Sequence, residues 1–317
     1  KIVLADYART WGTNNLIINS NGLNFQGSPD TYTVDYSTAG QSLSIVYSDA
    51  TKGWIPISDD AVTDAPVAPV TQKAIFGYGY TGSYTAITNL VSSSGVVASD
   101  VTGVGTARRQ LAAASYGGDK AIFAYGRSSA EGVVSMSNLV SNSGVVAADV
   151  TGVGTARRAL AAASYGTDKA IFGYGFVAAV SSLTNLVSNS GVVAADVTGV
   201  GTARHELAAT SYGTDKAIFG YGGSGGDRSL TNLVSNVGVV ATDTTGVGTA
   251  RVNLAGVGYG STGQAMFGYG SGYTAVTNLV SNVGVVSTDT TGVGTARGEL
   301  GAAAYGGDKA IFGYGYS

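Results

Sequence analysis

The sequence contains no cysteine, and this absence excludes a disulfide framework, cysteine-based zinc sites and a thiol nucleophile. His205 is the only histidine, so a histidine-based metal site is not expected. Lysine and arginine together number 17 against 20 acidic residues, and the net charge of −3 argues against nucleic-acid binding. No apolar run approaches the length of a membrane span, so membrane insertion is not expected.

Helical periodicity of useful length is also missing, and short apolar runs bounded by Gly, Asn, Ser or Asp take its place. One run, KAIFGYG, begins at residue 73 and returns with small changes at residues 120, 169, 216, 264 and 309. Intervals of 45 to 49 residues indicate a repeat architecture.

Each repeat contains four runs that predict short strands, namely LAAASYG, KAIFGYG, NLVS and VVAADVTG. Four strands per unit and a period in the forties favour a β-propeller of four-stranded blades over residues 73–317, with a β-solenoid as the alternative. Three of the runs occur five times and KAIFGYG six times. We therefore favour five blades, the last KAIFGYG closing the ring in place of the first, although six remain possible.

The phrase GVGTAR ends each repeat on an arginine, and an aspartate precedes that arginine by eight residues. Constant spacing of an acid and a base in every unit favours a structural role, in which charge-assisted hydrogen bonds tie the blade edges together. A ring of five ligand-binding arginines is the alternative. The residues concerned are Asp100, Arg108, Asp149, Arg157, Asp196, Arg204, Asp243, Arg251, Asp289 and Arg297.

Residues 1–58 do not share the repeat, and their alternating segments 14–27, 31–37 and 42–57 predict a small all-β module. Both tryptophans, Trp11 and Trp54, fall in this module, where packing is the expected role. Residues 59–72 are acidic and contain two of the four prolines, which is typical of an extended linker.

Two resemblances follow from these motifs. TAR before one strand and FGYG closing the next resemble kelch-like propeller repeats, and KAIFGYG–TNLVSN–GVV–TGVGTAR–LAA is similar to repeats in virion proteins of tailed bacteriophages. The N-terminal stretch resembles small β modules of phage tail fibres. The resemblance implies a virion location, a homotrimer held through the N-terminal module, other virion proteins as neighbours, and an outward domain that contacts a host cell-surface glycan or protein.

The repeats differ from one another at two places, the loop after KAIFGYG and the residue pair after TAR. In a four-strand meander both places fall on one face, so a constant scaffold with one diversified face suggests a recognition surface. Relaxed drift in exposed loops is the alternative. Aromatic and charged side chains suit such contacts, and the candidates are Tyr80, Tyr84, Arg127, Phe176, His205, Arg228 and Tyr273.

Enzymatic chemistry is not expected, and no catalytic residue, cofactor or metal is assigned. GYGYTG and GYGGSG match a dinucleotide motif, but no helix follows to hold a pyrophosphate. A glycan depolymerase needs two carboxylates beside the bond, whereas Glu131, Glu206, Asp227 and Glu299 lie in separate repeats. A non-enzymatic virion fibre that attaches to the host is the leading function. A purely structural capsid or tail component, and less so a depolymerase or secreted lectin, are the alternatives.

Overall fold

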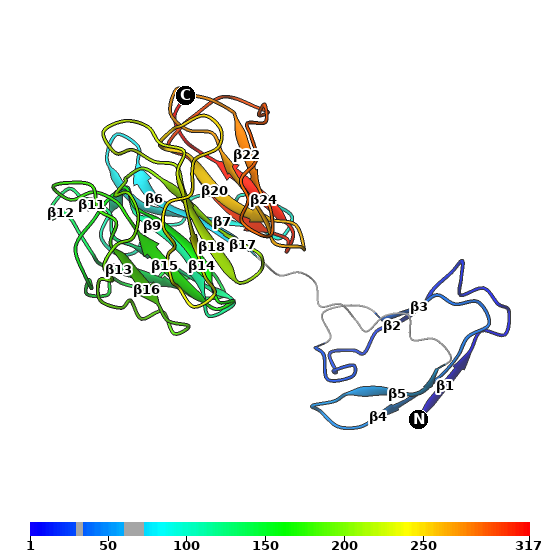
Figure 1. The fold of residues 1–317 in the computed structure, drawn as a ribbon. Coiled ribbons are helices and arrows are strands. Elements are labelled where there is room, and N and C mark those ends of the chain that lie inside the picture. Colours follow the sequence, from blue (N-terminus) through cyan, green and yellow to red (C-terminus); the bar gives the residue numbers. More distant parts are fainter. Residues whose placement is uncertain (30–33, 60–72) are drawn as a thin grey trace. The chain divides into compact units, whose positions relative to one another are not determined.

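The computed structural model describes residues 1–29, 34–59 and 73–317, and these residues form strands and turns without a helix. The all-β class is therefore confirmed. The chain divides into two compact units, Lys1–Thr71 and Gln72–Ser317 (Figure 1). The linker expected at 59–72 lies outside the described residues, except that Asp59 is the last residue of a strand in the first unit.

The N-terminal unit contains two small antiparallel sheets, β1–β4–β5 and β2–β3. Their strands are β1 (Ile2–Ala5), β2 (Leu16–Ile18), β3 (Val34–Tyr36), β4 (Ser42–Tyr47) and β5 (Trp54–Asp59). The inward residues of these alternating strands form the core around Phe25, Tyr36 and Leu43. Trp11 and Trp54 pack partly buried against this core, which confirms their packing role.

Three of the four runs in each repeat form the strands that were expected. The runs LAAASYG, KAIFGYG and NLVS become the edge, middle and opposite edge of an antiparallel sheet. The sheets are β6 (Ala74–Tyr80) with β7 (Tyr84–Val91); β9 (Ala112–Tyr116), β10 (Lys120–Ala124) and β13 (Ser137–Val140); β14 (Ala161–Tyr165), β15 (Lys169–Gly173) and β16 (Thr184–Val187); β17 (Ala208–Tyr212), β18 (Lys216–Gly220) and β19 (Thr231–Val234); β20 (Ala255–Tyr259), β21 (Gln264–Gly268) and β22 (Thr277–Val280); and β23 (Gly301–Tyr305) with β24 (Lys309–Gly313).

The fourth run, VVAADVTG, does not form a continuous strand, so the prediction of four full strands is wrong. It makes two isolated bridges to the NLVS strand, such as Val187 with Val193 and Thr184 with Val197. Between the bridges, the side chain of Asn185 donates to the carbonyl oxygen of Ala194 and to the carboxylate of Asp196. The amide side chain thus occupies the position where a regular ladder would continue.

The sheet count also differs from the favoured five. Residues 73–317 are all described, and their six KAIFGYG copies lie in six separate sheets. The last copy does not replace the first: β6 pairs with β7, and β24 pairs with β23. The first of these sheets has no LAAASYG strand, and the last has no NLVS strand.

Neighbouring sheets pack through their small and aromatic residues. A methyl group on Gly256 of β20 would lie 2.8 Å from the carbonyl oxygen of Ala209 in β17, so the small residues of the LAAASYG strands permit a close approach between sheets. Likewise a methyl group on Gly173 would lie 2.7 Å from Phe219 of the next sheet.

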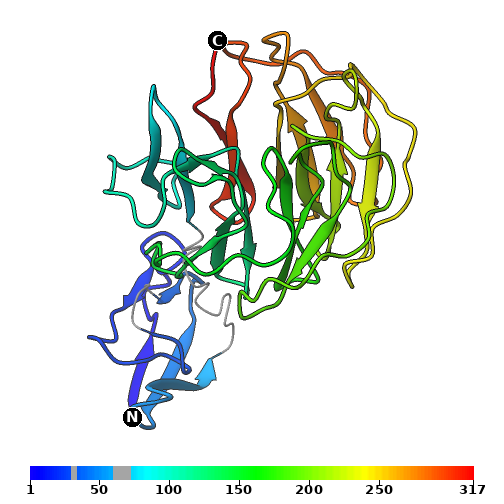
Figure 2. The ribbon, with the colours of Figure 1, turned by 90° about the vertical axis from the view of Figure 1, so that its left-hand side faces the viewer.

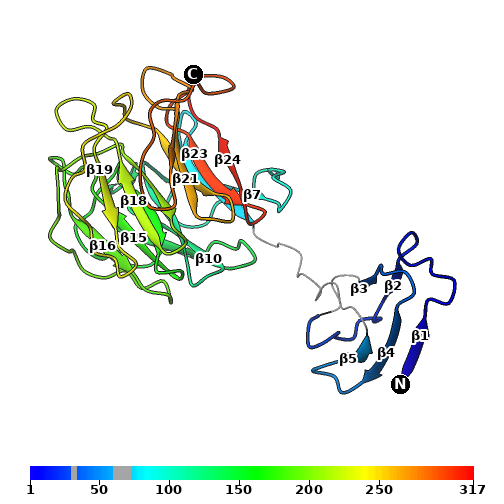
Figure 3. The ribbon, with the colours of Figure 1, turned by 45° about the vertical axis from the view of Figure 1, so that its right-hand side comes forward.

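The tyrosine that follows each phenylalanine by two residues packs against the phenylalanine of the next sheet. The rings meet edge-on, as for Tyr174 and Phe219 at 5.1 Å between ring centroids, or tilted, as for Tyr125 and Phe172. This order returns to its start, because Tyr314 of the last sheet contacts Phe76 of the first at 5.1 Å. Figures 2 and 3 show the C-terminal strands β23 and β24 beside the cyan β6–β7 hairpin.

Candidate recognition surface

The two variable parts of each repeat lie against one another. The first residue after TAR forms a backbone bridge with the residue that follows GYG, as Arg158 does with Phe176, His205 with Gly223 and Gly298 with Tyr316. In the second repeat the same contact widens into a small sheet of β8 (Arg108–Arg109), β11 (Arg127–Ser128) and β12 (Gly132–Val133). We call these residue pairs and loops the variable surface: residues 109–110, 158–159, 205–206, 252–253 and 298–299, with loops 80–87, 127–136, 176–183, 223–230 and 271–276.

The second residue of each pair links the sheets into a row. Gln110, Ala159, Glu206, Asn253 and Glu299 all have a left-handed backbone, with φ between 53° and 56°. From Ala159 onward, the N–H of each residue donates to the carbonyl oxygen of the one before it, at 2.8 to 3.0 Å. Side chains that are about 47 residues apart in the sequence therefore stand next to one another in space.

A first cluster joins Tyr80 and Tyr84 of the first sheet to Arg109 of the second. The two rings meet edge-on at 5.6 Å. The Arg109 guanidinium lies 4.9 Å from the centroid of Tyr80 and 5.3 Å from that of Tyr84. Cation–π contacts at this range stabilise the group, and Tyr80 keeps 53% of its surface exposed.

A second cluster surrounds Phe176. Arg158 lies 5.0 Å from its ring centroid, and the imidazole of His205 meets it edge-on at 5.6 Å. Arg158 also donates to the side-chain oxygen of Gln110 at 2.8 Å. Nδ1 of His205 is 3.5 Å from a carboxylate oxygen of Glu206, so this cluster spans three sheets.

A third cluster contains Tyr273 and Tyr316, whose ring centroids are 6.0 Å apart. Both are exposed, at 53% and 67%. They line a recess of about 200 Å³ together with Asn253, Ser271, Gly272, Gly298 and Glu299. Aromatic faces, an amide and a carboxylate around one recess are the chemistry that binds a polar, ring-shaped ligand such as a sugar.

The sequence thus identified five members of these clusters, and two candidates stand apart from them. Arg127 is exposed at the start of β11, and Arg228 is exposed and donates to the carbonyl oxygen of Ser224 within its own loop. Sequence reasoning did not select Arg109, Arg158 or Tyr316. The two arginines belong to the variable pairs, and this was the signal that could have found them.

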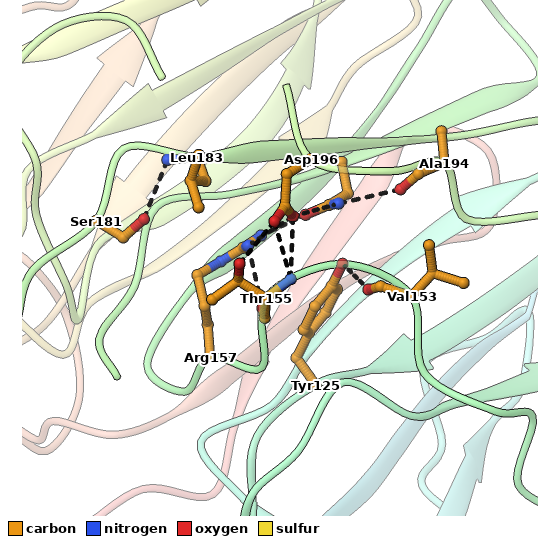
Figure 4. Close-up of polar contacts among 9 residues, drawn as sticks. Tyr125, Val153, Thr155, Arg157, Ser181, Leu183, Ala194 and Asp196 are labelled. Carbon is orange, nitrogen blue, oxygen red and sulfur yellow. Dashed lines mark hydrogen bonds and ion pairs between the residues drawn. The ribbon is translucent and has the colours of Figure 1, made fainter. Parts of the chain in front are cut away.

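Beneath the variable surface, the TAR arginines form a repeated buried network (Figure 4). Arg157 is fully buried; its guanidinium donates to Asn185 at 2.5 Å and to the carbonyl oxygen of Thr155 at 3.2 Å. It lies 3.4 Å from the carboxylate of Asp196 and 4.9 Å from the ring centroid of Tyr125 in the preceding sheet. Arg108 and Arg204 have the same arrangement, and Arg251 has the same asparagine, carbonyl and tyrosine partners.

The aspartate in each network is not the one that precedes the arginine by eight residues. The ion pairs are Arg108–Asp149, Arg157–Asp196 and Arg204–Asp243, so each arginine meets the aspartate of the following repeat. Both residues belong to one sheet, where the arginine enters the first strand and the aspartate follows the third. The bond therefore ties the two edges of a single sheet together, and a ligand-binding role for these buried arginines is not supported.

Burial and hydrogen bonding shift the pKa values of the aspartates and tyrosines in this network. Burial opposes ionisation of Asp196 and Asp243, but hydrogen bonds from a threonine and an asparagine outweigh it and lower the pKa of both carboxyls. Burial raises the pKa of Tyr125, Tyr174 and Tyr221 to about 12, although the guanidinium beside each ring acts in the opposite direction. The network is therefore a hydrogen-bonded support with a buried arginine and a partly exposed aspartate.

The described residues provide no group of three or more acids or histidines placed to hold a metal ion. Nor do residues 1–29, 34–59 and 73–317 contain a helix long and apolar enough to cross a membrane. Of the carboxylates considered for glycan cleavage, Asp227 accepts a hydrogen bond from Ser271 and Glu299 lines the tyrosine recess. No protein-family model matches the chain, and no curated protein matches its sequence.

Proposed function

We propose that this chain is a non-enzymatic appendage of a phage particle, which attaches to the host surface through the variable surface of a β-propeller. The propeller is supported by the six sheets, whose aromatic contacts run from each to the next and from the last to the first. Sheets of three strands and a bridged fourth segment, arranged in this order, fit propeller blades.

One observation carries the recognition role. The backbone row places five side chains of four types next to one another, while the arginine network beneath four of them is nearly identical. A buried network that is the same in each repeat, supporting surface residues that differ between repeats, is suited to specific binding of a partner. The first and third clusters supply the exposed rings of Tyr80, Tyr273 and Tyr316, and aromatic side chains commonly dominate binding energy. The Tyr273–Tyr316 recess suits a host glycan.

The N-terminal unit is proposed to hold copies of the chain on the particle, as a homotrimer beside other virion proteins. Tyr7 is 99% exposed and Val3 63% exposed in that unit, which supports a contact with another chain. Several copies on one particle would convert weak individual contacts into useful avidity.

A purely structural role has one observation in its favour. The first valine of each GVV turn is 64% to 65% exposed in every repeat (Val96, Val145, Val192, Val239 and Val285). An identical exposed apolar residue in each repeat suits an assembly contact. A density map of the intact particle separates the two roles, because attachment requires the variable surface to face outward.

Binding of the purified chain to host cells and to their extracted surface polysaccharide tests the attachment role. The double variants Tyr80→Ala with Tyr84→Ala, Phe176→Ala with His205→Ala, and Tyr273→Ala with Tyr316→Ala each remove one cluster. We expect at least one of them to lose tenfold or more in affinity. Val192→Ala with Val239→Ala, on the constant turns, is the matched control and should bind normally. Unchanged binding by all three cluster variants would refute the proposal.

A further inference from the structure

In the C-terminal unit, the first and last sheets each contain only part of an arginine network. In the first sheet, Asn89 donates to Asp100 at 2.8 Å as in every other network, but no TAR arginine precedes that sheet. In the last sheet, Arg297 lies 5.0 Å from the ring centroid of Tyr269, but that sheet has no NLVS strand to supply the asparagine and the aspartate of the other networks. Among the described residues, the half with the acid and the half with the arginine are thus separated.

The strands paired beside these halves, β6 with β7 and β24 with β23, are interchangeable in sequence. Residues 73–80 and 309–316 both read KAIFGYGY, whereas the other four copies differ from this sequence in at least one residue. The first segment forms β6 and the second forms β24. Every side chain that β6 presents to β7 and to the second sheet could therefore be presented by β24.

The left-handed row also ends at this place. Its five residues form four hydrogen bonds, from Ala159 to Gln110 and onward to Glu299 with Asn253. A fifth bond, from the N–H of Gln110 to the carbonyl oxygen of Glu299, would close the row. The first sheet stands between the two ends and contributes no residue of this kind, because no TAR segment enters it.

We propose that β24 exchanges with β6 as the partner of β7, which closes the repeats into five complete sheets. In the exchanged form, Thr295 and Arg297 meet Asn89 and Asp100, as Thr202 and Arg204 meet Asn232 and Asp243. The incoming strand already lies beside its target: Tyr314 contacts Phe76, and burial together with the charge of Asp100 raises the pKa of Tyr314.

The balance of contacts favours the exchange locally. Because the two strands are identical, β24 restores the contacts that β6 gives up, including the stacking of the Arg108 guanidinium on a tyrosine ring. The gain is a fifth complete network, with an asparagine and an aspartate as partners for the Arg297 guanidinium. The cost is the short hairpin of β6 with β7, which turns at residues 81–83.

The exchange also changes the variable surface. Tyr80 pairs with Tyr84 at the end of the β6–β7 ladder. When β24 takes that place, Tyr316 stands opposite Tyr84 and beside Arg109, and it leaves the recess that it shares with Tyr273. The inference does not depend on the proposed attachment role, because it concerns strand pairing alone.

Disulfide trapping tests the exchange, since the chain has no cysteine of its own. Ile75 pairs with Leu90 in this structure, and Ile311 is the counterpart of Ile75. The variant Leu90→Cys with Ile311→Cys reports the exchanged pairing, and Leu90→Cys with Ile75→Cys reports the pairing seen here. Ile171→Cys with Leu186→Cys, a pair of the same register in a complete sheet, shows whether this position admits a disulfide.

We expect the Leu90–Ile311 variant to form an intramolecular disulfide in a large fraction of monomers under mild oxidation. Absence of that disulfide, while the Leu90–Ile75 and Ile171–Leu186 variants oxidise fully, overturns the proposal. A Leu90–Ile311 disulfide found only between chains also overturns it, in favour of pairing between copies.

A second measurement uses no new cysteine. Melting temperatures are compared for Asp100→Ala, Arg297→Ala and the double variant, with Asp243→Ala and Arg204→Ala as the matched set. In the exchanged form both pairs are coupled, so each double variant should lose less than the sum of its single variants. Strict additivity for Asp100 with Arg297, beside coupling in the matched set, counts against the exchange.

Discussion

At the scale of single residues, the molecule depends on an arginine that is charged, buried and fully enclosed. Arg204 has an asparagine, an aspartate and a carbonyl oxygen at its edge, and a tyrosine ring on its face. Burial lowers the pKa of this guanidinium, while Tyr174 and Asp243 act in the opposite direction. A buried charge is tolerable only because these partners replace the lost water.

Removal of this arginine should therefore be costly. We expect Arg204→Ala to lower the free energy of unfolding by about 3–5 kcal/mol, because it leaves Asp243 and Asn232 without their partner. Urea denaturation measures the change. Arg228→Ala, at an exposed loop arginine, is the control and should stay within about 0.5 kcal/mol of the parent. Equal effects of the two variants would contradict the assigned role of the network.

The buried tyrosines predict a loss of stability in alkali. The pKa of Tyr174 is about 12 in the folded chain against 10.0 as a free group, so only the unfolded chain releases this proton between those values. Its contribution is complete below pH 10 and falls as pH rises toward 12. Tyr174→Phe should remove about 3 kcal/mol of that loss. Unfolding followed by circular dichroism at several pH values measures it, with Tyr7→Phe as the exposed control. An alkaline slope that is the same in both variants would contradict the prediction.

At the scale of the element, the GVGT turn is fitted around the network. The backbone of Thr202 and its hydroxyl both donate to Asp243, and Gly201 adopts a φ of +76° beside that carboxylate. A side chain at Gly201 would collide with Asp243 and Asn232. The glycine is therefore required both for the left-handed backbone and for the space.

Comparison of two glycines separates these requirements. Gly201→Ala and Gly225→Ala both place alanine at a positive φ, but nothing lies within 4 Å of the added methyl group at Gly225. We expect Gly201→Ala to cost about 1–3 kcal/mol more than Gly225→Ala because of overpacking. Thermal unfolding measures the difference. Similar costs would mean that backbone strain alone explains the glycine.

Within each repeat, the sequence predicted the positions of the strands better than the pairing of arginine with aspartate. Short apolar runs identified the strands because burial on a sheet needs nothing beyond a local pattern. The partner of Arg157 was misassigned because, in a periodic sequence, a constant spacing to Asp149 implies a nearly constant spacing to Asp196 as well. Spacing alone therefore does not distinguish Asp149 from Asp196 as the partner of Arg157. Asp196 is the partner because the chain returns across the same sheet and places it beside the arginine.

The recognition residues were predictable to a similar degree. A meander places both variable regions together, so their proximity followed from strand order. The stacking of Arg109 on Tyr80 could not be read in the same way, because it joins two different sheets. Such contacts depend on how neighbouring sheets pack, and the sequence of one repeat contains no information on that angle.

At the scale of the whole molecule, the contact between the first and last sheets is the weakest of its kind. Phe76 packs on Tyr314 and lies within 3.0 Å of the sites where Gly301 and Gly313 would carry a methyl group. Yet Phe76 is half-buried and Tyr314 is 56% exposed, whereas Phe219 and Tyr174 are fully buried. Local opening should begin at this contact.

The variant Phe76→Ala should show where the repeats open. We expect faster hydrogen exchange in β6, β23 and β24, with a smaller loss of global stability than the about 3–5 kcal/mol expected for Phe219→Ala. Exchange monitored by mass spectrometry maps the effect to peptides. Uniform acceleration across all sheets would contradict a weak point at this contact.

The left-handed row has a consequence for how this surface can change. Its sheet-to-sheet bonds are made by N–H and carbonyl groups, so glutamine, alanine, glutamate and asparagine all occupy the row with the same φ and the same bonds. Replacement of one such side chain leaves the bonds of its neighbours intact. The row positions therefore change without disturbing one another's backbone bonds. A library at Gln110, Glu206, Asn253 and Glu299 that omits proline and β-branched residues should yield new specificities with little loss of folded protein, since Ala159 is buried and a positive φ disfavours those residues.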